Sequence, residues 1–483
     1  MNTGFSALFT DFYSLTMAQG YWKHHMNNRA VFEMFFRRHP FGGGFSVFAG
    51  LETLIECLNN FSFSREDLAY LDSLHIFEDS FLDYLGAIRF SGALWSVDEG
   101  TIVFPQEPLI RIESNLIEAQ IIEGLILNII NFQSLIATKT ARVWLASNKG
   151  AIMEFGLRRA QGINGAISAS RAAFIGGAAG TSNVLAGKTY GIPVMGTMAH
   201  AWVMSFPSEE EAFRAYAALY PDKTVFLIDT YDTLKSGIQT AIKIGGELAA
   251  KGKNFGVRLD SGDMHYLSVE VRKRLNAAGF SRATITASND LDESIIETLT
   301  RAEAPINTWG VGTQMVTGGN DAAFTGVYKI SAKDEGKGVF IPTMKFSDNP
   351  EKTTNPGIKQ IWRLKDKKGL AVADVLSLED PEDPDILEVG GRYSFWHPQA
   401  DYRRFCHTIE GNAVPLLKKR LQGGVLLEDT PSLRSIQKLV QEGLENFDQS
   451  YKRLLNPHIY KVSITERLRT LKLNLIKSYF GNL

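Results

Sequence analysis

Residues 225 to 260 decide the fold, because two short apolar runs there flank a long helical pattern. The runs are Val225-Phe-Leu-Ile-Asp229 and Phe255-Gly-Val-Arg-Leu-Asp260, and the helical pattern extends from Thr233 to Ala250. A strand, a helix and a second strand in this order indicate parallel pairing across a βαβ crossover. Each run also ends on a carboxylate.

The same alternation of short runs and helical patterns continues on both sides of this stretch. Further runs are Ala151-Ile-Met-Glu-Phe-Gly156, Val194-Met-Gly-Thr197, Ala283-Thr-Ile-Thr-Ala-Ser288, Ile306-Asn-Thr-Trp-Gly-Val311 and Gly326-Val-Tyr-Lys-Ile330. Further helix candidates are Glu209 to Leu219, Tyr266 to Ala278 and Leu291 to Ala302. No GxGxxG follows the first run, so the pattern favours a closed or nearly closed barrel over an open doubly wound sheet. We predict the α/β class with an irregular, TIM-like barrel.

The alternation is confined to the middle of the chain, which divides the sequence into three predicted parts. Residues 1–120 mix helical and strand patterns and form an N-terminal α+β domain. Residues 121–345 form the α/β barrel, which is the catalytic domain. Residues 346–483 form a C-terminal domain that ends in amphipathic helices over residues 432–446 and 464–480.

Composition and charge describe a soluble protein of more than one domain. The 483 residues are 44% hydrophobic and 22% charged, and the formal net charge of −2 gives no field that favours nucleic acid as a partner. Polar residues break the longest apolar stretch, residues 121–137, so no membrane span is expected. The N-terminus lacks the pattern of a secretory signal. Cys57 and Cys406 show no CxxC spacing, which argues against a disulfide framework or a thiolate zinc site and favours the cytoplasm.

Polar residues end nearly every run of the predicted barrel, where separate loops converge on one mouth. These residues are Glu154, Arg158, Arg159, Thr197, His200, Asp229, Arg258, Asp260, Asp263, Asn289, Asp290, Gly312 and Thr313. Such a set suits a pocket for a polyanion, with a divalent cation held by oxygen ligands. Phosphates are the leading candidate ligands, and His200 is the predicted chemical centre.

Structural explanations compete with several of these assignments. His200 follows an apolar run and could be a satisfied core histidine. The segments Asp260-Ser-Gly-Asp263 and Asn289-Asp290 precede helical patterns, and each could be an N-cap alone. Gly42-Gly-Gly44 could cradle a phosphate, but no Lys-Ser/Thr follows as a P-loop requires, so a turn is the better interpretation.

A set of motifs resembles the nicotinate phosphoribosyltransferase family. In order, they are Thr10-Asp-Phe-Tyr-Ser-Leu-Thr-Met-Ala18, Phe41-Gly-Gly-Gly-Phe45, Glu154-Phe-Gly-Leu-Arg-Arg-Ala-Gln-Gly162, Gly180-Thr-Ser-Asn-Val-Leu-Ala-Gly187, Gly196-Thr-Met-Ala-His200, Arg258-Leu-Asp-Ser-Gly-Asp263 and Gly310-Val-Gly-Thr313. The motifs keep the family's order over most of the chain, which makes the set more specific than any single motif. The C-terminal part resembles the family only loosely.

The resemblance implies an irregular α/β barrel in the centre of a three-part chain, and a homodimer with shared active sites. It implies that nicotinate and 5-phosphoribosyl 1-pyrophosphate give nicotinate mononucleotide and pyrophosphate with Mg²⁺, the first step of NAD synthesis from nicotinate. ATP hydrolysis would be coupled to this reaction through a phosphorylated histidine, which by position is His200.

The resemblance also implies substrate contacts. Tyr13, Thr197 and Arg258 would contact nicotinate. Thr313 would contact the phosphoribosyl phosphate. Phe155 and Tyr13 would sandwich the pyridine ring, with Tyr13 arriving from the other subunit. Many members carry Ser at the position of Ala201, and a backbone N–H can replace that hydroxyl's contact to phosphate.

The chemistry of these side chains agrees with such roles. Loss of pyrophosphate from a ribosyl C1 spreads positive charge over the sugar ring, which nearby carboxylates stabilise. Asp229 and Asp260 suit this task, one through the ribose hydroxyls and one through Mg²⁺, and the sequence leaves open which does which. Arg158 and Arg258 present planar forks that match carboxylate or phosphate oxygens. His200 can attack the γ-phosphate of ATP, since neutral imidazole is available near pH 7.

Three other functions compete with this interpretation. Transfer to nicotinamide is the nearest, but the nicotinamide enzyme carries an Asp at the position of Ser182, and that Asp would repel a carboxylate. A metal-dependent barrel hydrolase could use Asp229, Asp260, Asp263 and His200, but HxH and HExxH spacings are absent. A nucleotide sensor without catalysis would not need His200 and both carboxylates.

Overall fold

The computed structural model describes residues 5–349, 352–379, 387–400 and 402–481. They form two compact units, which we call the first unit (Met1–Leu135 with Ala323–Leu483) and the second unit (Ile136–Ala322). The predicted N-terminal and C-terminal parts thus belong to one unit. The second unit is shorter than the predicted barrel domain at both ends, and helix α6, Glu123–Ala146, contains the boundary between the units.

The second unit contains a parallel six-stranded sheet. Its strands are β6 Ala151–Glu154, β7 Gly180–Thr181, β8 Val225–Leu227, β9 Gly256–Leu259, β10 Thr284–Asn289 and β11 Thr308–Val311. They are ordered β7-β6-β11-β10-β9-β8, and all neighbours are parallel. The last strand, β11, pairs with the first, β6, as strands do in a barrel. This confirms the α/β class and the parallel pairing predicted from the alternation.

The sheet curls but stays open along one seam. The run at Val194 forms a single parallel bridge with Thr181 instead of a strand, because Pro193 and Gly196 flank it and interrupt a ladder. Among the described residues, no pairing joins Val194 to β8. The described strands therefore form a curled, open sheet, and the TIM-like barrel stays a prediction.

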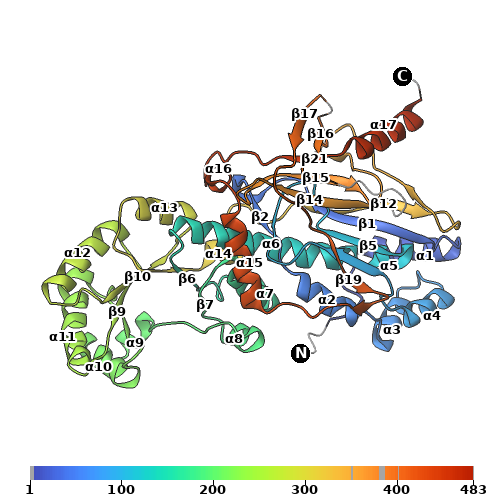
Figure 1. Cartoon of the computed structure of the whole chain (residues 1–483). Helices are drawn as coiled ribbons and strands as arrows, with labels where there is room; N and C mark the ends of the chain where they lie inside the picture. The colour runs from blue at the N-terminus through green and yellow to red at the C-terminus, as the bar shows by residue number, and fades with distance from the viewer. Residues whose placement is uncertain (1–4, 350–351, 380–386, 401, 482–483) are drawn as a thin grey trace. The chain divides into compact units, whose positions relative to one another are not determined.

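Helices follow the strands of the second unit and lie along the outer side of its sheet (Figure 1). The longer ones are α7 Gly162–Gly176, α10 Glu209–Leu219, α11 Ile238–Ala249, α12 Met264–Ala277 and α13 Glu293–Arg301. The short ones are α8 Val184–Tyr190, α9 His200–Met204 and α14 Thr313–Thr317. Helix α10 has the predicted bounds. A π-helical turn, η2 Thr233–Gly237, precedes α11, so the helical pattern from Thr233 is confirmed.

One run assigned to the barrel lies in the other unit. Strand β12, Gly326–Asp334, pairs antiparallel with β1, Arg29–Phe36, in a seven-stranded sheet ordered β13-β12-β1-β5-β3-β19-β20. The prediction that Gly326 to Ile330 is a barrel strand was wrong, because a short apolar run does not indicate its partner. Tyr328 stacks on Phe32 with a centroid distance of 4.9 Å and joins the core of the first unit.

The first unit contains the remaining elements. Its other strands are β2 Ser46–Val47, β3 Ala93–Ser96, β4 Ile102–Val103, β5 Ile110–Asn115, β13 Phe340–Pro342, β14 Lys359–Lys365, β15 Ala371–Leu378, β16 Arg392–Trp396, β17 Arg404–Thr408, β18 Ala413–Pro415, β19 Lys418–Gln422, β20 Val425–Leu426 and β21 Val462–Ile464. Its helices are α1 Phe12–Lys23, η1 Pro40–Gly42, α2 Leu51–Asn59, α3 Arg65–Ser73, α4 Asp79–Ala87, α5 Leu116–Ile121, α15 Leu433–Glu445, α16 Gln449–Lys452 and α17 Glu466–Phe480. Strands β14 to β18 and β21 form a second six-stranded sheet, ordered β17-β16-β21-β15-β14-β18.

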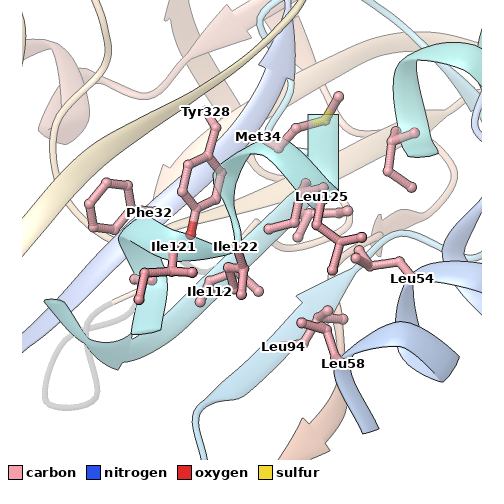
Figure 2. Close-up of a cluster of buried hydrophobic side chains, with 14 of the residues drawn as sticks. Phe32, Met34, Leu54, Leu58, Leu94, Ile112, Ile121, Ile122, Leu125 and Tyr328 are labelled. Carbon is pink, nitrogen blue, oxygen red and sulfur yellow. The ribbon is translucent and has the colours of Figure 1, made fainter. Parts of the chain in front are cut away.

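Apolar side chains from helices and strands meet in one core of the first unit. Figure 2 shows Leu54 and Leu58 of α2 close to Leu94 of β3, with Ile112 of β5 and Leu125 of α6 nearby. Each of these five residues is at most 2% exposed. Burial of each side chain of this size contributes about 1.5–3 kcal/mol to the stability of the folded state. The shared core therefore holds the strands and helices of this unit together.

A group of charged side chains is also fully enclosed in the first unit. We call Glu107, Arg363, Asp374 and Tyr460 the buried cluster. Arg363 donates from Nε to Asp374 Oδ1 at 3.0 Å and from Nη2 to Asp374 Oδ2 at 2.6 Å, and the Tyr460 hydroxyl donates to Asp374 at 3.0 Å. Burial raises the pKa of Glu107 well above its usual range, and the neighbouring Asp374 raises it further. Both effects favour the protonated form of Glu107.

The glycine triplet makes a turn, as predicted. The 3₁₀ turn η1 covers Pro40–Gly42, and a Cβ atom on Gly44 would lie 2.5 Å from the Tyr451 carbonyl oxygen. Gly44 is therefore needed for close packing against the C-terminal segment. No helix in the described residues is long and apolar enough to cross a membrane.

Candidate active site

The carboxyl ends of neighbouring parallel strands bring most of the predicted site residues together. We call Thr197, His200, Asp229, Arg258 and Asp260 the mouth cluster. Asp229 follows β8, Arg258 belongs to β9 and Asp260 follows β9. The Asp260 backbone N–H donates to Asp229 Oδ2 at 3.0 Å, and this bond joins the ends of the two strands.

Asp260 lies at the centre of the mouth cluster. The Ser288 hydroxyl of β10 donates to Asp260 Oδ1 in a short hydrogen bond. Arg258 Nη2 lies 3.9 Å from the same oxygen, and His200 Nε2 lies 3.7 Å from the other, Oδ2. The ends of β9 and β10 and the start of α9 therefore meet around one carboxylate.

His200 is not a buried core histidine. It begins α9, and its side chain is 40% exposed. Nδ1 lies 3.1 Å from the Thr230 hydroxyl, a bond whose direction depends on the tautomer. The ring is thus held between Thr230 and Asp260 while one side stays open to solvent, as a nucleophile requires.

Arg258 is largely buried beside both carboxylates. Its Nη1 donates to Thr197 Oγ1 in a short hydrogen bond, and its side chain is 13% exposed. Burial lowers the pKa of Arg258, whereas Asp260 and Asp229 raise it and Arg158 lowers it. An arginine remains charged in proteins, so the mouth cluster holds one permanent cation between two acids.

Two buried polar atoms of the mouth cluster have no hydrogen-bond partner among the described residues. They are Arg258 Nε, a donor, and Asp229 Oδ1, an acceptor. Most buried polar atoms in native proteins are paired, so such orphaned atoms call for a ligand or a water molecule. The other oxygen of Asp229 is already saturated by Asp260 N–H and by the Ser261 hydroxyl at 2.6 Å.

Glu154 was predicted at the mouth, but it has a structural role. It is 1% exposed and accepts hydrogen bonds from the Gly156 N–H, the Ser170 hydroxyl of α7 and the Thr181 hydroxyl of β7. These bonds use both of its oxygens. Glu154 therefore joins β6, α7 and β7 and is not available to a substrate.

The other predicted substrate contacts lie on elements of the second unit, apart from Tyr13. The Phe155 N–H donates to the Val311 carbonyl at 2.8 Å, and its ring lies against Gly310, where a Cβ atom would be only 2.8 Å away. The Ser182 N–H donates to the Glu154 carbonyl at 2.9 Å. Arg158 is exposed in the loop after β6, and Thr313 begins α14.

The N-cap alternative is correct for one of the two candidates. Asp263 caps α12 and accepts from the Tyr266 N–H at 3.0 Å. The cap of α13 is Asp292, not Asn289 or Asp290. Asn289 has φ 126°, a backbone conformation that residues other than glycine rarely adopt.

Sequence reasoning missed Thr230, Ser261 and Ser288. Each directly follows a predicted acid or ends a predicted strand, so position was an available signal. Their hydroxyls contact predicted site residues. Ser and Thr are uncharged, so the sequence alone does not single them out. Their role in the site is recognised only when the residues they contact in space are known.

The mouth cluster fits a cation that is bound mainly by substrate. In the described part of the chain, no three His, Cys, Asp or Glu side chains gather closely enough to hold a metal ion. The free oxygen of Asp229 and the carboxylate of Asp260 nevertheless offer the hard oxygen ligands that Mg²⁺ takes, and Mg²⁺ commonly binds through one or two carboxylates plus substrate phosphates.

Comparison with known families covers most of the chain. Models of the nicotinate phosphoribosyltransferase (NAPRTase) N-terminal domain, family and C-terminal domain match residues 8–131, 151–376 and 358–472. The last match includes most of the C-terminal part, which resembles the family only loosely by motif. The family assignment therefore does not depend on the barrel motifs alone.

Comparison with individual relatives supports the same family assignment. Nicotinate phosphoribosyltransferase from Bacillus subtilis is 41% identical over 464 residues, which cover 95% of this chain and 93% of the relative. The relative from Homo sapiens is 33% identical over 523 residues, covering 96% and 95%. A crystal structure of human nicotinic acid phosphoribosyltransferase has a TM-score of 0.85 at 31% identity, covering 96% of this chain and 99% of that one. With its barrel-like sheet, its mouth cluster and these matches, the chain belongs to the nicotinate phosphoribosyltransferase family.

Proposed function

We propose that this protein joins nicotinate to 5-phosphoribosyl 1-pyrophosphate, giving nicotinate mononucleotide and pyrophosphate, with Mg²⁺ bound and ATP hydrolysis coupled through phosphorylated His200. The observation that carries the proposal is the orphaned pair in the mouth cluster, Arg258 Nε and Asp229 Oδ1. A buried donor and a buried acceptor in one cluster suit substrates that together supply an anionic group and hydroxyl groups, as nicotinate and a phosphoribosyl compound do.

The ribosyl transfer assigns different tasks to the two carboxylates. The pyridine nitrogen forms a bond to C1 of the ribose as the bond from C1 to the pyrophosphate oxygen breaks. Asp229 Oδ1 accepts from a ribose hydroxyl, because this oxygen is the unpaired one. Asp260, at the centre of the cluster, stabilises positive charge on the sugar. Mg²⁺, when bound through Asp229 or Asp260, would neutralise charge on the leaving pyrophosphate.

His200 serves the ATP reaction in this proposal. A ring nitrogen forms a bond to the γ-phosphorus as the bond from that phosphorus to the bridging oxygen breaks, and ADP leaves. Thr230 and Asp260 hold the ring from two sides, so the imidazole is oriented before ATP binds. The exposed side of the ring gives the phosphoryl group access.

The remaining predicted residues bind the base and the 5′-phosphate. Phe155, which packs on Gly310, supplies one face of the base site, and Tyr13 of the partner subunit in a homodimer supplies the other. Arg158, Ser182, Thr197 and Arg258 surround the nicotinate carboxylate, and Thr313 binds the phosphate. Tyr13 is 48% exposed and lies beside the exposed Phe9 and Phe12 in sequence, which supports a role at a subunit contact.

Product analysis tests the proposal directly. Purified protein is incubated with 5-phosphoribosyl 1-pyrophosphate and Mg²⁺, with nicotinate or nicotinamide, and with or without ATP. We expect nicotinate mononucleotide and pyrophosphate, with faster formation and release of ADP when ATP is present. A preference for nicotinamide would favour the sister activity, and no mononucleotide from either base would overturn the proposal.

A further inference from the structure

The two ends of the Tyr13 side chain have different surroundings. The residue is 48% exposed, so much of its ring faces solvent. Its hydroxyl, however, donates to Glu123 Oε2 at 3.2 Å, and the Glu123 side chain is only 11% exposed. An exposed ring is thus anchored at its far end by a nearly buried carboxylate. Glu123 is not among the site residues predicted from the sequence.

The carboxylate of Glu123 is itself fixed. Gln120 Nε2 donates to Oε2 at 2.9 Å, and Lys329 Nζ of β12 lies 3.4 Å from Oε1. Glu123 is also the first residue of α6, where the helix dipole favours a negative charge. These contacts fix the Glu123 carboxylate independently of its hydrogen bond with Tyr13.

The backbone that carries Tyr13 is fixed to the same region. The Thr10 hydroxyl donates to the Ile121 carbonyl at 2.7 Å, just before α1 begins. At Gly124, a Cβ atom would lie 3.7 Å from Thr10 Cα, so the start of α1 packs directly against the first turn of α6. Both the backbone and the hydroxyl of Tyr13 are therefore tied to residues 120–124.

We propose that Glu123 is a positioning residue, which holds the Tyr13 hydroxyl so that the exposed ring is a preformed stacking surface for the pyridine base. This inference rests on the proposed function, because it needs Tyr13 to contact nicotinate. A hydrogen bond to an ionised acceptor is stronger than one between neutral groups. A ring held in its bound orientation loses less conformational entropy when the base binds, and binding is tighter for that reason.

The hydroxyl acts as the donor throughout the working pH range. Burial raises the pKa of Tyr13, and the charge of Glu123 raises it further. The phenol therefore keeps its proton, and the Tyr13 bond to Glu123 does not titrate near neutral pH. A purely structural role, in which Glu123 only ties α1 to α6, would change stability without changing the binding of one substrate.

A double-mutant cycle separates these two roles. The variants are Tyr13→Phe, which removes the hydroxyl and keeps the ring, Glu123→Ala, and the double variant. Glu123→Gln keeps an acceptor oxygen and serves as the conservative variant. Tyr70→Phe is the matched control, since Tyr70 is also exposed, at 56%, in the same unit. KM for nicotinate, KM for 5-phosphoribosyl 1-pyrophosphate, kcat and the melting temperature are measured for each.

We expect Tyr13→Phe and Glu123→Ala each to raise KM for nicotinate about fivefold, with KM for 5-phosphoribosyl 1-pyrophosphate within twofold of wild type. KM for nicotinate of the double variant should not exceed that of the more affected single variant, because each single substitution already removes the same Tyr13–Glu123 hydrogen bond. Glu123→Gln should recover part of the loss. Tyr70→Phe should behave as wild type.

The outcomes distinguish this inference from the proposed function. If wild type forms no nicotinate mononucleotide, the proposed function fails. If wild type is active and Tyr13→Phe leaves KM for nicotinate unchanged, the positioning role is wrong. If the increases in KM for nicotinate caused by Tyr13→Phe and Glu123→Ala multiply in the double variant, the two residues act independently. That result would also overturn the positioning role. Should Glu123→Ala fail to fold, Tyr13→Phe and Glu123→Gln still give the KM comparison.

Discussion

The mouth cluster and the buried cluster contain the same kinds of groups, an arginine with two carboxyl groups, in different surroundings. In the buried cluster the arginine binds Asp374 through two nitrogens, and burial and Asp374 raise the pKa of the second acid, Glu107. In the mouth cluster both an arginine nitrogen and a carboxylate oxygen remain unpaired. Glu107 Oε1 of the buried cluster has no partner when the acid is ionised, but a protonated Glu107 can donate to Asp374. The fold itself can therefore complete the buried cluster, whereas no group among the described residues completes Arg258 Nε or Asp229 Oδ1.

Removal of one partner from the buried cluster should have the largest effect. Asp374→Ala leaves the Arg363 guanidinium without a counter-ion in a fully buried position. We expect the free energy of unfolding to fall by about 3–5 kcal/mol. Chemical denaturation measured by far-UV circular dichroism gives this value. A loss below 1 kcal/mol would show that Asp374 is not needed to compensate Arg363.

Asp229→Asn should affect activity rather than stability. The amide keeps the shape of the side chain and can still accept from Asp260 N–H, but the charge toward the ligand is lost. We expect kcat to fall about a hundredfold, since loss of one group that stabilises a transition state typically costs that much. The melting temperature should change little. A variant that loses stability but keeps its activity would reverse the comparison of the two clusters.

Glu107→Gln should change how stability depends on pH. The folded-state pKa of Glu107 is raised well above the usual range, so the wild-type free energy of unfolding declines as pH rises from the unfolded pKa toward the folded one. Glutamine resembles the protonated acid and cannot ionise. We expect the variant to lose this decline, so its stability relative to wild type should rise as pH increases above the unfolded-state pKa of Glu107. Parallel curves for the two proteins would mean that Glu107 is ionised in the folded state.

Asp263→Ala gives the smallest expected effect. Asp263 lies close to the mouth cluster in sequence, but its carboxylate caps α12. Loss of the cap should reduce the free energy of unfolding by about 1 kcal/mol. Thermal unfolding measures this loss, and the kcat/KM for nicotinate should stay within threefold of wild type. A fall in activity as large as that of Asp229→Asn would place Asp263 in the site.

The sequence predicted regular features better than features that depend on contacts far along the chain. Helix α10 was predicted correctly because its pattern is bounded by the cap Ser208 and by Leu219. Strand β12 was misplaced, since its apolar run does not reveal whether Arg29–Phe36 or a barrel strand pairs with it.

The site shows the same limit. The charged residues Asp229, Arg258 and Asp260 were predicted from their positions at strand ends, and the structure brings them together. Glu154 has the same sequence position but is used inside the fold. Position along a strand does not tell whether a hydroxyl from another element, such as that of Ser170, already satisfies a carboxylate.

The open seam of the parallel sheet has a consequence for the segment that carries His200. Residues 195–199 join the single bridge at Val194 to α9, and α9 is anchored to α10 by the Trp202 Nε1 bond to the Ala212 carbonyl at 3.0 Å. Insertion of a strand there would fix the backbone of this segment by ladder hydrogen bonds on both sides. Without those bonds, the segment can shift by small torsional changes while the strands that hold Asp229 and Arg258 keep their register. Under the proposed function, this freedom would make room for a phosphoryl group on His200.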